Sequence, residues 1–113
     1  MHEMALCESV IDIIEREAQR QGFSKVRTVW LEIGALSHVE PEAMRFCFAA
    51  VSRNTIASGA AFEIVPVSGE AWCMACATTV AIAGRGDPCG LCGGHQLQVT
   101  AGEELRVKEL EVD

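Results

Sequence analysis

Four of the six cysteines in this 113-residue chain lie within one stretch of twenty residues. Cys73 and Cys76 form one Cys-x2-Cys pair, and Cys89 and Cys92 form a second pair after a gap of twelve residues. Each pair can direct two sulfurs inward from one tight turn, and the gap lets the second turn fold back over the first. Four thiolates then make a closed tetrahedral site, which suits Zn(II), an ion without redox chemistry.

The cysteine pattern leaves two alternatives to zinc, namely iron bound by the same four sulfurs and a redox dithiol. A redox dithiol usually has one Cys-x-x-Cys at the start of a helix rather than two facing turns. A closed site leaves no position for water activation, so we expect the zinc to be structural. A zinc deaminase is excluded because it needs a His-x-Glu with the histidine on zinc, whereas His2 and Glu3 are adjacent and distant in sequence from the cysteines.

The first three residues, Met-His-Glu, offer a second set of metal donors. A free α-amine on Met1, the amide nitrogen of His2 and the His2 imidazole can close two adjacent chelate rings. The amide nitrogen of Glu3 is one step further along the chain. These nitrogens lie naturally in a plane, which suits Ni(II) or Cu(II). Taken alone, the same residues are also compatible with a solvated chain end.

Two further histidines lie elsewhere in the chain. His38 belongs to the stretch "GALSHVEPE", which is typical of a polar loop. His95 follows Cys92 by three residues. It is either a residue at the start of a strand or an additional ligand for the N-terminal metal site.

Two helices are predicted. Residues 5–21 carry apolar side chains at helical spacing, and Gly22 suits the end of that helix. Pro41 suits the first turn of a second helix. The apolar face of that helix contains Met44, Cys47, Phe48 and Val51. We interpret Cys7 and Cys47 as small buried side chains of these helices.

Four strands are predicted outside the cysteine-rich segment. They cover residues 26–33, 61–67, 95–100 and 105–112. Pro66 favours an edge position for the second of them. Within residues 105–112 the apolar side chains change phase, which indicates a β-bulge or a switch of faces.

This order of elements predicts an α+β fold with an inserted domain. Residues 1–69 and 96–113 would form a small α/β domain of two helices on a three- or four-stranded sheet, which carries the N-terminal metal donors. Residues 70–95 would form a zinc-ribbon-like domain with four cysteine ligands. A core this small often has help from a metal.

Composition and motifs exclude several classes of function. The formal net charge is −7, which argues against a nucleic-acid partner. The chain has no apolar run long enough to span a membrane and no visible signal peptide, so we expect a reducing, cytoplasmic location. The sequence shows no nucleophile–base pairing and no glycine-rich phosphate loop, so we do not expect an enzyme.

Three stretches together resemble one protein family: "MHEMALCESVIDIIE", "VWLEIGALSHVEPEAMRFCF" and the double Cys-x2-Cys that ends in "CGLCGG". This combination resembles the HypA/HybF proteins of hydrogenase nickel incorporation over essentially the whole chain. The Met-His-Glu start and the "GALSHVEPEAMRF" block are the most specific parts, since the cysteine spacing alone is generic.

The resemblance implies a nickel metallochaperone with Ni(II) and Zn(II) sites. It implies delivery of nickel to the large subunit of [NiFe]-hydrogenase, in some members also to urease, together with a nickel-handling GTPase. The family's nickel histidine falls on His2 with Glu3 beside it, and its zinc thiolates fall on the four cysteines. A further nickel donor stays open between the Met1 amine and a side chain such as His95.

We expect a monomer or weak homodimer that binds neither nucleic acid nor membrane. The alternative function is a zinc-ribbon module for protein interactions without nickel delivery, which leaves the Met-His-Glu start unexplained.

Overall fold

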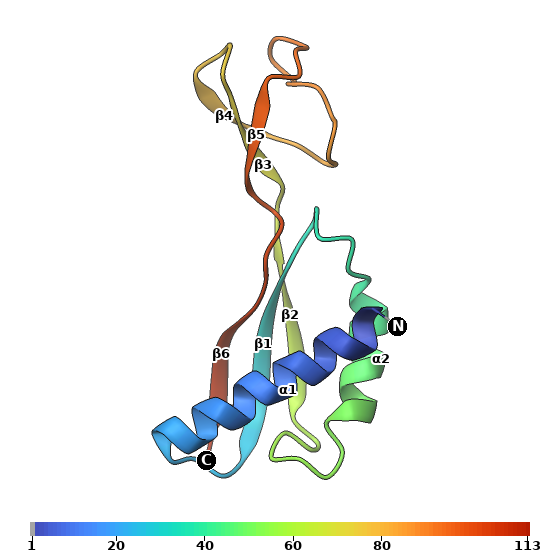
Figure 1. Cartoon of the computed structure of the whole chain (residues 1–113), viewed down its shortest axis with the longest axis vertical. Coiled ribbons are helices and arrows are strands. Elements are labelled where there is room, and N and C mark those ends of the chain that lie inside the picture. The colour runs from blue at the N-terminus through green and yellow to red at the C-terminus, as the bar shows by residue number, and fades with distance from the viewer. Residues whose placement is uncertain (1) are drawn as a thin grey trace. The chain divides into compact units, whose positions relative to one another are not determined.

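The computed structural model describes residues 2–113, so Met1 lies outside the described part of the chain. The elements, shown in Figure 1, are α1 (His2–Gln21), β1 (Val26–Gly34), α2 (Pro41–Val51), β2 (Ala61–Val67), β3 (Glu70–Cys73), β4 (Thr78–Ala81), β5 (Leu97–Ala101) and β6 (Leu105–Val112). Neither of these helices is long and apolar enough to cross a membrane.

The strands form two separate three-stranded sheets, which confirms the predicted α+β class. One sheet has the order β2-β1-β6 and the other has the order β4-β3-β5. Strand β2 is an edge strand, as Pro66 predicted. Two compact units follow from this arrangement. The first unit contains the chain up to Leu31, Val39–Val65 and Arg106–Asp113, and the second contains Glu32–His38 and Pro66–Leu105.

The first unit is built around α1, α2 and the central strand β1. Helix α1 packs against α2, where the Cys7 thiol lies 3.5 Å from the carbonyl oxygen of Met44. The Phe48 and Phe62 rings stack with their centroids 4.4 Å apart and so join α2 to β2. Cys7 and Cys47 are both buried, which confirms that they belong to the core.

Helix α1 begins at His2, three residues earlier than the apolar spacing predicted. The reason lies in Glu3, whose carboxylate occupies the first turn, where a negative charge interacts favourably with the helix dipole. One oxygen of that carboxylate also accepts the backbone N–H of Glu40 at 3.4 Å. His2 and Glu3 therefore belong to an ordered helical turn rather than to a solvated end.

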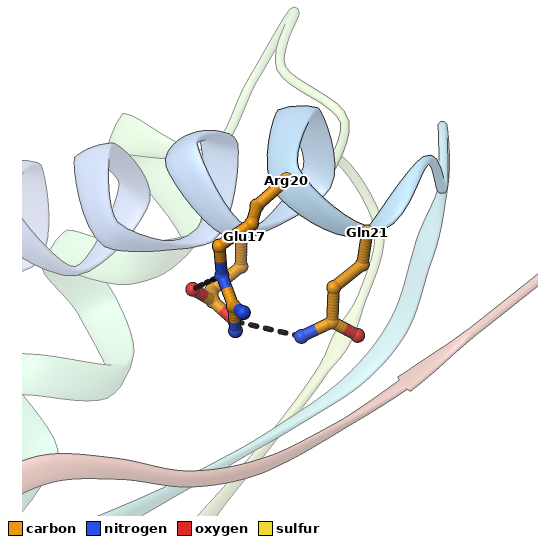
Figure 2. Close-up of polar contacts among 3 residues, drawn as sticks. All are labelled: Glu17, Arg20 and Gln21. Atoms are coloured by element: carbon orange, nitrogen blue, oxygen red, sulfur yellow. Dashed lines mark hydrogen bonds and ion pairs between the residues drawn. The ribbon is translucent and has the colours of Figure 1, made fainter.

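The other end of α1 is closed as predicted. Gly22 adopts a left-handed φ of 83° and donates its N–H to the Ala18 oxygen at 2.8 Å. In the last turns, the Glu17 carboxylate accepts hydrogen bonds from the side chains of Arg20 and Gln21 (Figure 2). The positive side chain of Arg20 suits the C-terminal end of the helix dipole.

Strand β5 belongs to the second sheet, although the sequence grouped residues 96–113 with the first domain. Its Leu97 and Val99 lie opposite Cys73 and Ala71 of β3. Both side chains pack against the core of the second unit. The alternating pattern of residues 95–100 identified a strand, but a period of two does not say which sheet a strand joins.

Three glycines let backbone segments of the second unit approach closely. A Cβ atom on Gly34 would lie 2.0 Å from the Gly102 carbonyl oxygen, and one on Gly102 would lie 2.6 Å from the Gly69 Cα. Backbone hydrogen bonds join the same segments, from Gly34 to the Glu104 oxygen and from Leu36 to the Gly102 oxygen, each at 2.7 Å. No side chain fits between these segments.

We expect Gly34→Ala to destabilise the second unit, because the new methyl group would meet backbone that cannot rotate away. Overpacking of this kind costs about 1–3 kcal/mol or more. Thermal unfolding followed by circular dichroism measures the loss. Gly90→Ala is the matched control, because a Cβ atom at Gly90 meets nothing within 4 Å. Equal melting temperatures for the two variants would contradict the role of the close contact.

Candidate metal centre

The four predicted cysteines come together at one end of the second sheet. Their sulfur atoms all lie within 4.8 Å of one another. The Sγ atoms of Cys73 and Cys92 are 3.8 Å apart, and those of Cys76 and Cys89 are 4.0 Å apart. A tetrahedral zinc with Zn–S bonds of about 2.3 Å requires sulfurs about 3.8 Å apart, so the cluster has the dimensions of such a site.

The two Cys-x2-Cys turns share a hydrogen bond and a positive φ at equivalent positions. In the first turn Ala77 donates its N–H to the Cys73 oxygen at 2.8 Å, and in the second turn Gly93 donates to the Cys89 oxygen at 2.8 Å. The donor in each turn has a positive φ, 53° for Ala77 and 73° for Gly93. Ala77 holds this conformation despite its side chain. The repeat shows that both turns are shaped to direct two sulfurs toward one point.

Backbone N–H groups also point at three of the sulfurs. Cys76 donates to the Cys73 sulfur, Leu91 to the Cys89 sulfur and Gly94 to the Cys92 sulfur, each at 3.4 Å. Donors of this kind stabilise thiolates over thiols. At Cys89 they favour the charge state in which cysteine binds a metal.

Two cysteines of the cluster have pKa values shifted in opposite directions. Backbone N–H donors from Cys92 and Leu91 lower the pKa of Cys89 to about 7. Hydrogen bonds with the Cys92 and Cys73 sulfurs raise the pKa of Cys76 to about 12. Four thiolates this close repel one another, so full ionisation requires a cation among them. Zinc fits the donor set, as does iron with the same four ligands. Neither cysteine pair lies at the start of a helix, which disfavours the redox dithiol.

A small apolar core packs together with the cysteine cluster. Leu36, Ala71, Val80 and Ile82 pack there with Cys73 and Cys89. Leu36 is 2 % exposed and comes from the loop after β1, far from the cysteines in sequence. The sequence pattern does not mark Leu36 as a core residue, because the only local signal is an apolar residue between Gly34 and the polar residues Ser37 and His38. Cys73 and Cys89 are buried, Cys76 is half-buried and Cys92 is exposed.

The N-terminal donors lie in the first unit, on the first turn of α1. His2 is exposed and Glu3 is half-buried. Residues at the start of a helix have N–H groups without a carbonyl partner inside the helix. Met1, the third predicted donor, lies outside the described residues. Behind this turn, burial raises the pKa of Cys7 to about 11, with additional effects from Cys47 and Glu3.

The other two histidines lie in the second unit. His38 is an exposed loop residue with a left-handed φ of 61°, as the polar loop predicted. His95 is exposed and lies just before β5. Within residues 2–113, the four cysteines form the one group of three or more His, Cys, Asp or Glu side chains spaced to hold a metal ion.

Known proteins share the sequence pattern and the fold of this chain. The family model described as "Hydrogenase/urease nickel incorporation, metallochaperone, hypA" matches residues 1–112. The chain is 78 % identical to the hydrogenase maturation factor HypA of Rhodopseudomonas palustris strain BisA53 and 64 % identical to that of Bradyrhizobium sp. strain ORS 278, in each case over the full length of both chains.

Solved structures show the same fold. The solution structure of the Ni metallochaperone HypA from Helicobacter pylori has a TM-score of 0.73 at 22 % identity and covers 97 % of this chain and 96 % of that one. A second HypA solution structure has a TM-score of 0.73 at 25 % identity and covers 99 % of this chain and 96 % of that one. The chain therefore belongs to the HypA family of nickel-incorporation metallochaperones.

Proposed function

We propose that this protein carries Ni(II) on its first helical turn and delivers it to [NiFe]-hydrogenase during maturation, while a structural zinc holds the second unit. The observation that carries this proposal is the exposed imidazole of His2 on the first turn of α1, in a chain that belongs to the HypA family. The reported relatives are named hydrogenase maturation factors, which favours hydrogenase over urease as the recipient.

The nickel donors are the His2 imidazole and the backbone nitrogens of His2 and Glu3. At the start of a helix these amides donate to no helical carbonyl, so losing their protons to a metal breaks no hydrogen bond of the helix. The Glu3 carboxylate already accepts the Glu40 N–H, so we assign it to holding the turn in place. Nickel displaces protons from the imidazole and the amides, and its affinity therefore falls as the pH falls.

We predict that His2→Ala abolishes specific nickel binding and leaves zinc content and fold unchanged, because the exposed His2 side chain supports no part of the core. Nickel titration of untagged protein, followed by the d–d absorption of a planar complex, measures the effect. His38→Ala is the matched control, since His38 is also exposed but lies in the second unit. Unchanged nickel affinity in the His2→Ala protein would show that nickel is not bound at the N-terminus.

The fourth nickel donor is decided by two further variants in the same titration. A glycine inserted between Met1 and His2 interrupts the chelate rings that begin at the Met1 amine, and His95→Ala removes the alternative side chain. The change that weakens the planar nickel complex identifies the fourth donor.

We assign zinc to the four cysteines and give it a structural role. The second unit has a small core, in which two of the four metal ligands are themselves core residues. Metal binding must then supply much of its folding free energy, on the order of 10 kcal/mol for small zinc modules. A site of reduced thiols also agrees with a reducing, cytoplasmic compartment.

Cys73→Ser is expected to lose one zinc per chain and the ordered signals of the second unit, while the helices of the first unit survive. Metal analysis and two-dimensional NMR spectra report the two effects. The control is Cys47→Ala, which removes a buried thiol from the first unit. This variant should still bind one zinc per chain in the second unit. A Cys73→Ser spectrum with the second unit intact would refute the structural role of zinc.

The partner that handles nickel with this protein is the maturation GTPase, and we place its contact on the outer face of α2. Phe46 is 75 % exposed there, beside an ion pair between Glu42 and Arg45 at 3.3 Å. Aromatic side chains are enriched in the cores of protein interfaces. A substitution at Glu40 would not test this face alone, because the Glu40 carboxylate accepts the Glu42 N–H and caps α2. Its loss would also disturb the start of the helix.

Phe46→Asp should weaken binding of the purified GTPase at least about tenfold, in line with the loss of an interface anchor. Calorimetric titration measures the affinity, and circular dichroism checks the fold. Met74→Asp is the control, because Met74 is 62 % exposed but lies in the second unit. If the two variants bind equally well, the outer face of α2 is not the contact.

A further inference from the structure

The four sulfurs differ in how water reaches them, although they share one site. Cys73 is 0 % exposed and Cys89 is 2 % exposed, because both belong to the apolar core of the second unit. Cys76 is half-buried, and Cys92 alone among the four is exposed. A small oxidant that arrives through solvent therefore meets Cys92 before the other three cysteines.

One short sulfur–sulfur distance joins Cys92 to the other turn. The Cys92 Sγ is 3.8 Å from the Cys73 Sγ, while the Cys76 Sγ is 4.0 Å from the Cys89 Sγ. These close pairs join the two turns to each other rather than joining the cysteines of one Cys-x2-Cys motif. A disulfide requires sulfurs about 2.05 Å apart, so either pair needs a further approach of roughly 2 Å.

The Cys92 turn lies in more open surroundings than the Cys73 strand. A Cβ atom on Gly90, within the second turn, or on Gly93, directly after it, would meet nothing within 4 Å. Cys73 lies in β3, opposite Thr78 of β4 and Leu97 of β5. We therefore expect the Cys92 sulfur to make the larger movement as the two sulfurs approach.

We propose that Cys92 is a site of modification by hydrogen peroxide and that Cys73 resolves it, so that oxidation opens the metal centre in a defined order. This inference rests on the zinc site proposed above. It adds a peroxide-sensitive step to that site and does not depend on nickel.

The chemistry has two steps. The Cys92 thiolate attacks one peroxide oxygen, the O–O bond breaks, and a sulfenic acid and hydroxide form. The Cys73 thiolate then attacks the Cys92 sulfur, the S–O bond breaks, and a second hydroxide leaves as the disulfide forms. Two thiolates give up two electrons and one peroxide takes them up. Cys76 and Cys89 alone would then remain as thiolate ligands, and two ligands would hold zinc too weakly to keep it bound.

Zinc-loaded protein treated with hydrogen peroxide tests this order. Dimedone should trap the sulfenic acid at Cys92 at short times, and peptide mapping without dimedone should show a Cys73–Cys92 disulfide as one zinc is released. Cys7 and Cys47 should stay unmodified, because both are buried. A first disulfide within one motif, Cys73–Cys76 or Cys89–Cys92, would overturn the proposal.

A histidine variant keeps a zinc site, since Cys3His sets also bind zinc. Cys92→His should slow peroxide-driven zinc release about tenfold or more, because the accessible thiolate is gone. Cys47→Ala is the control, because it removes a buried thiol outside the zinc site and should release zinc at close to the original rate. Release from Cys92→His as fast as from the unaltered protein would disprove the role of Cys92. Protein that contains no zinc before peroxide is added would contradict the zinc assignment and this inference together.

Discussion

Repulsion between four neighbouring sulfurs is the constraint on which the second unit depends. The backbone holds them within 4.8 Å and aims N–H groups at three of them, an arrangement that favours thiolates. Thiolates at that distance need a cation between them. We therefore expect the metal, the two turns and the apolar core that contains Cys73 and Cys89 to form together.

The first unit has no such dependence and is held by ordinary packing. Its helices meet through Cys7 and Met44, and α2 meets β2 through the stacked Phe48 and Phe62 rings. This packing fixes α1 up to its first turn, where Glu3 accepts the Glu40 N–H. An ordered scaffold thus presents the exposed His2 side chain. This position suits the proposed carrier function, since a cargo held at the surface can pass to a partner without unfolding its host.

Local patterns in the sequence identified most of the elements and all four cysteines. The glycine after α1, the proline at the start of α2 and the Cys-x2-Cys spacing each act over a few residues, and each was found where predicted. The earlier start of α1 depends on a contact between residues 37 positions apart, which no local pattern encodes. The same holds for Leu36 in the cysteine core and for β5 in the second sheet.

The close packing of Gly34, Gly69 and Gly102 also limits how such a chain can diverge. At these positions it is the absence of a side chain that matters, because backbone atoms already occupy the space where a Cβ atom would lie. Any larger residue at one position requires another segment to move, so the three sites are bound to vary together or not at all. Around Gly86, by contrast, a Cβ atom meets nothing within 4 Å. Insertions that lengthen the chain in the course of evolution are therefore best accommodated in this loop after β4 and not where the glycines meet.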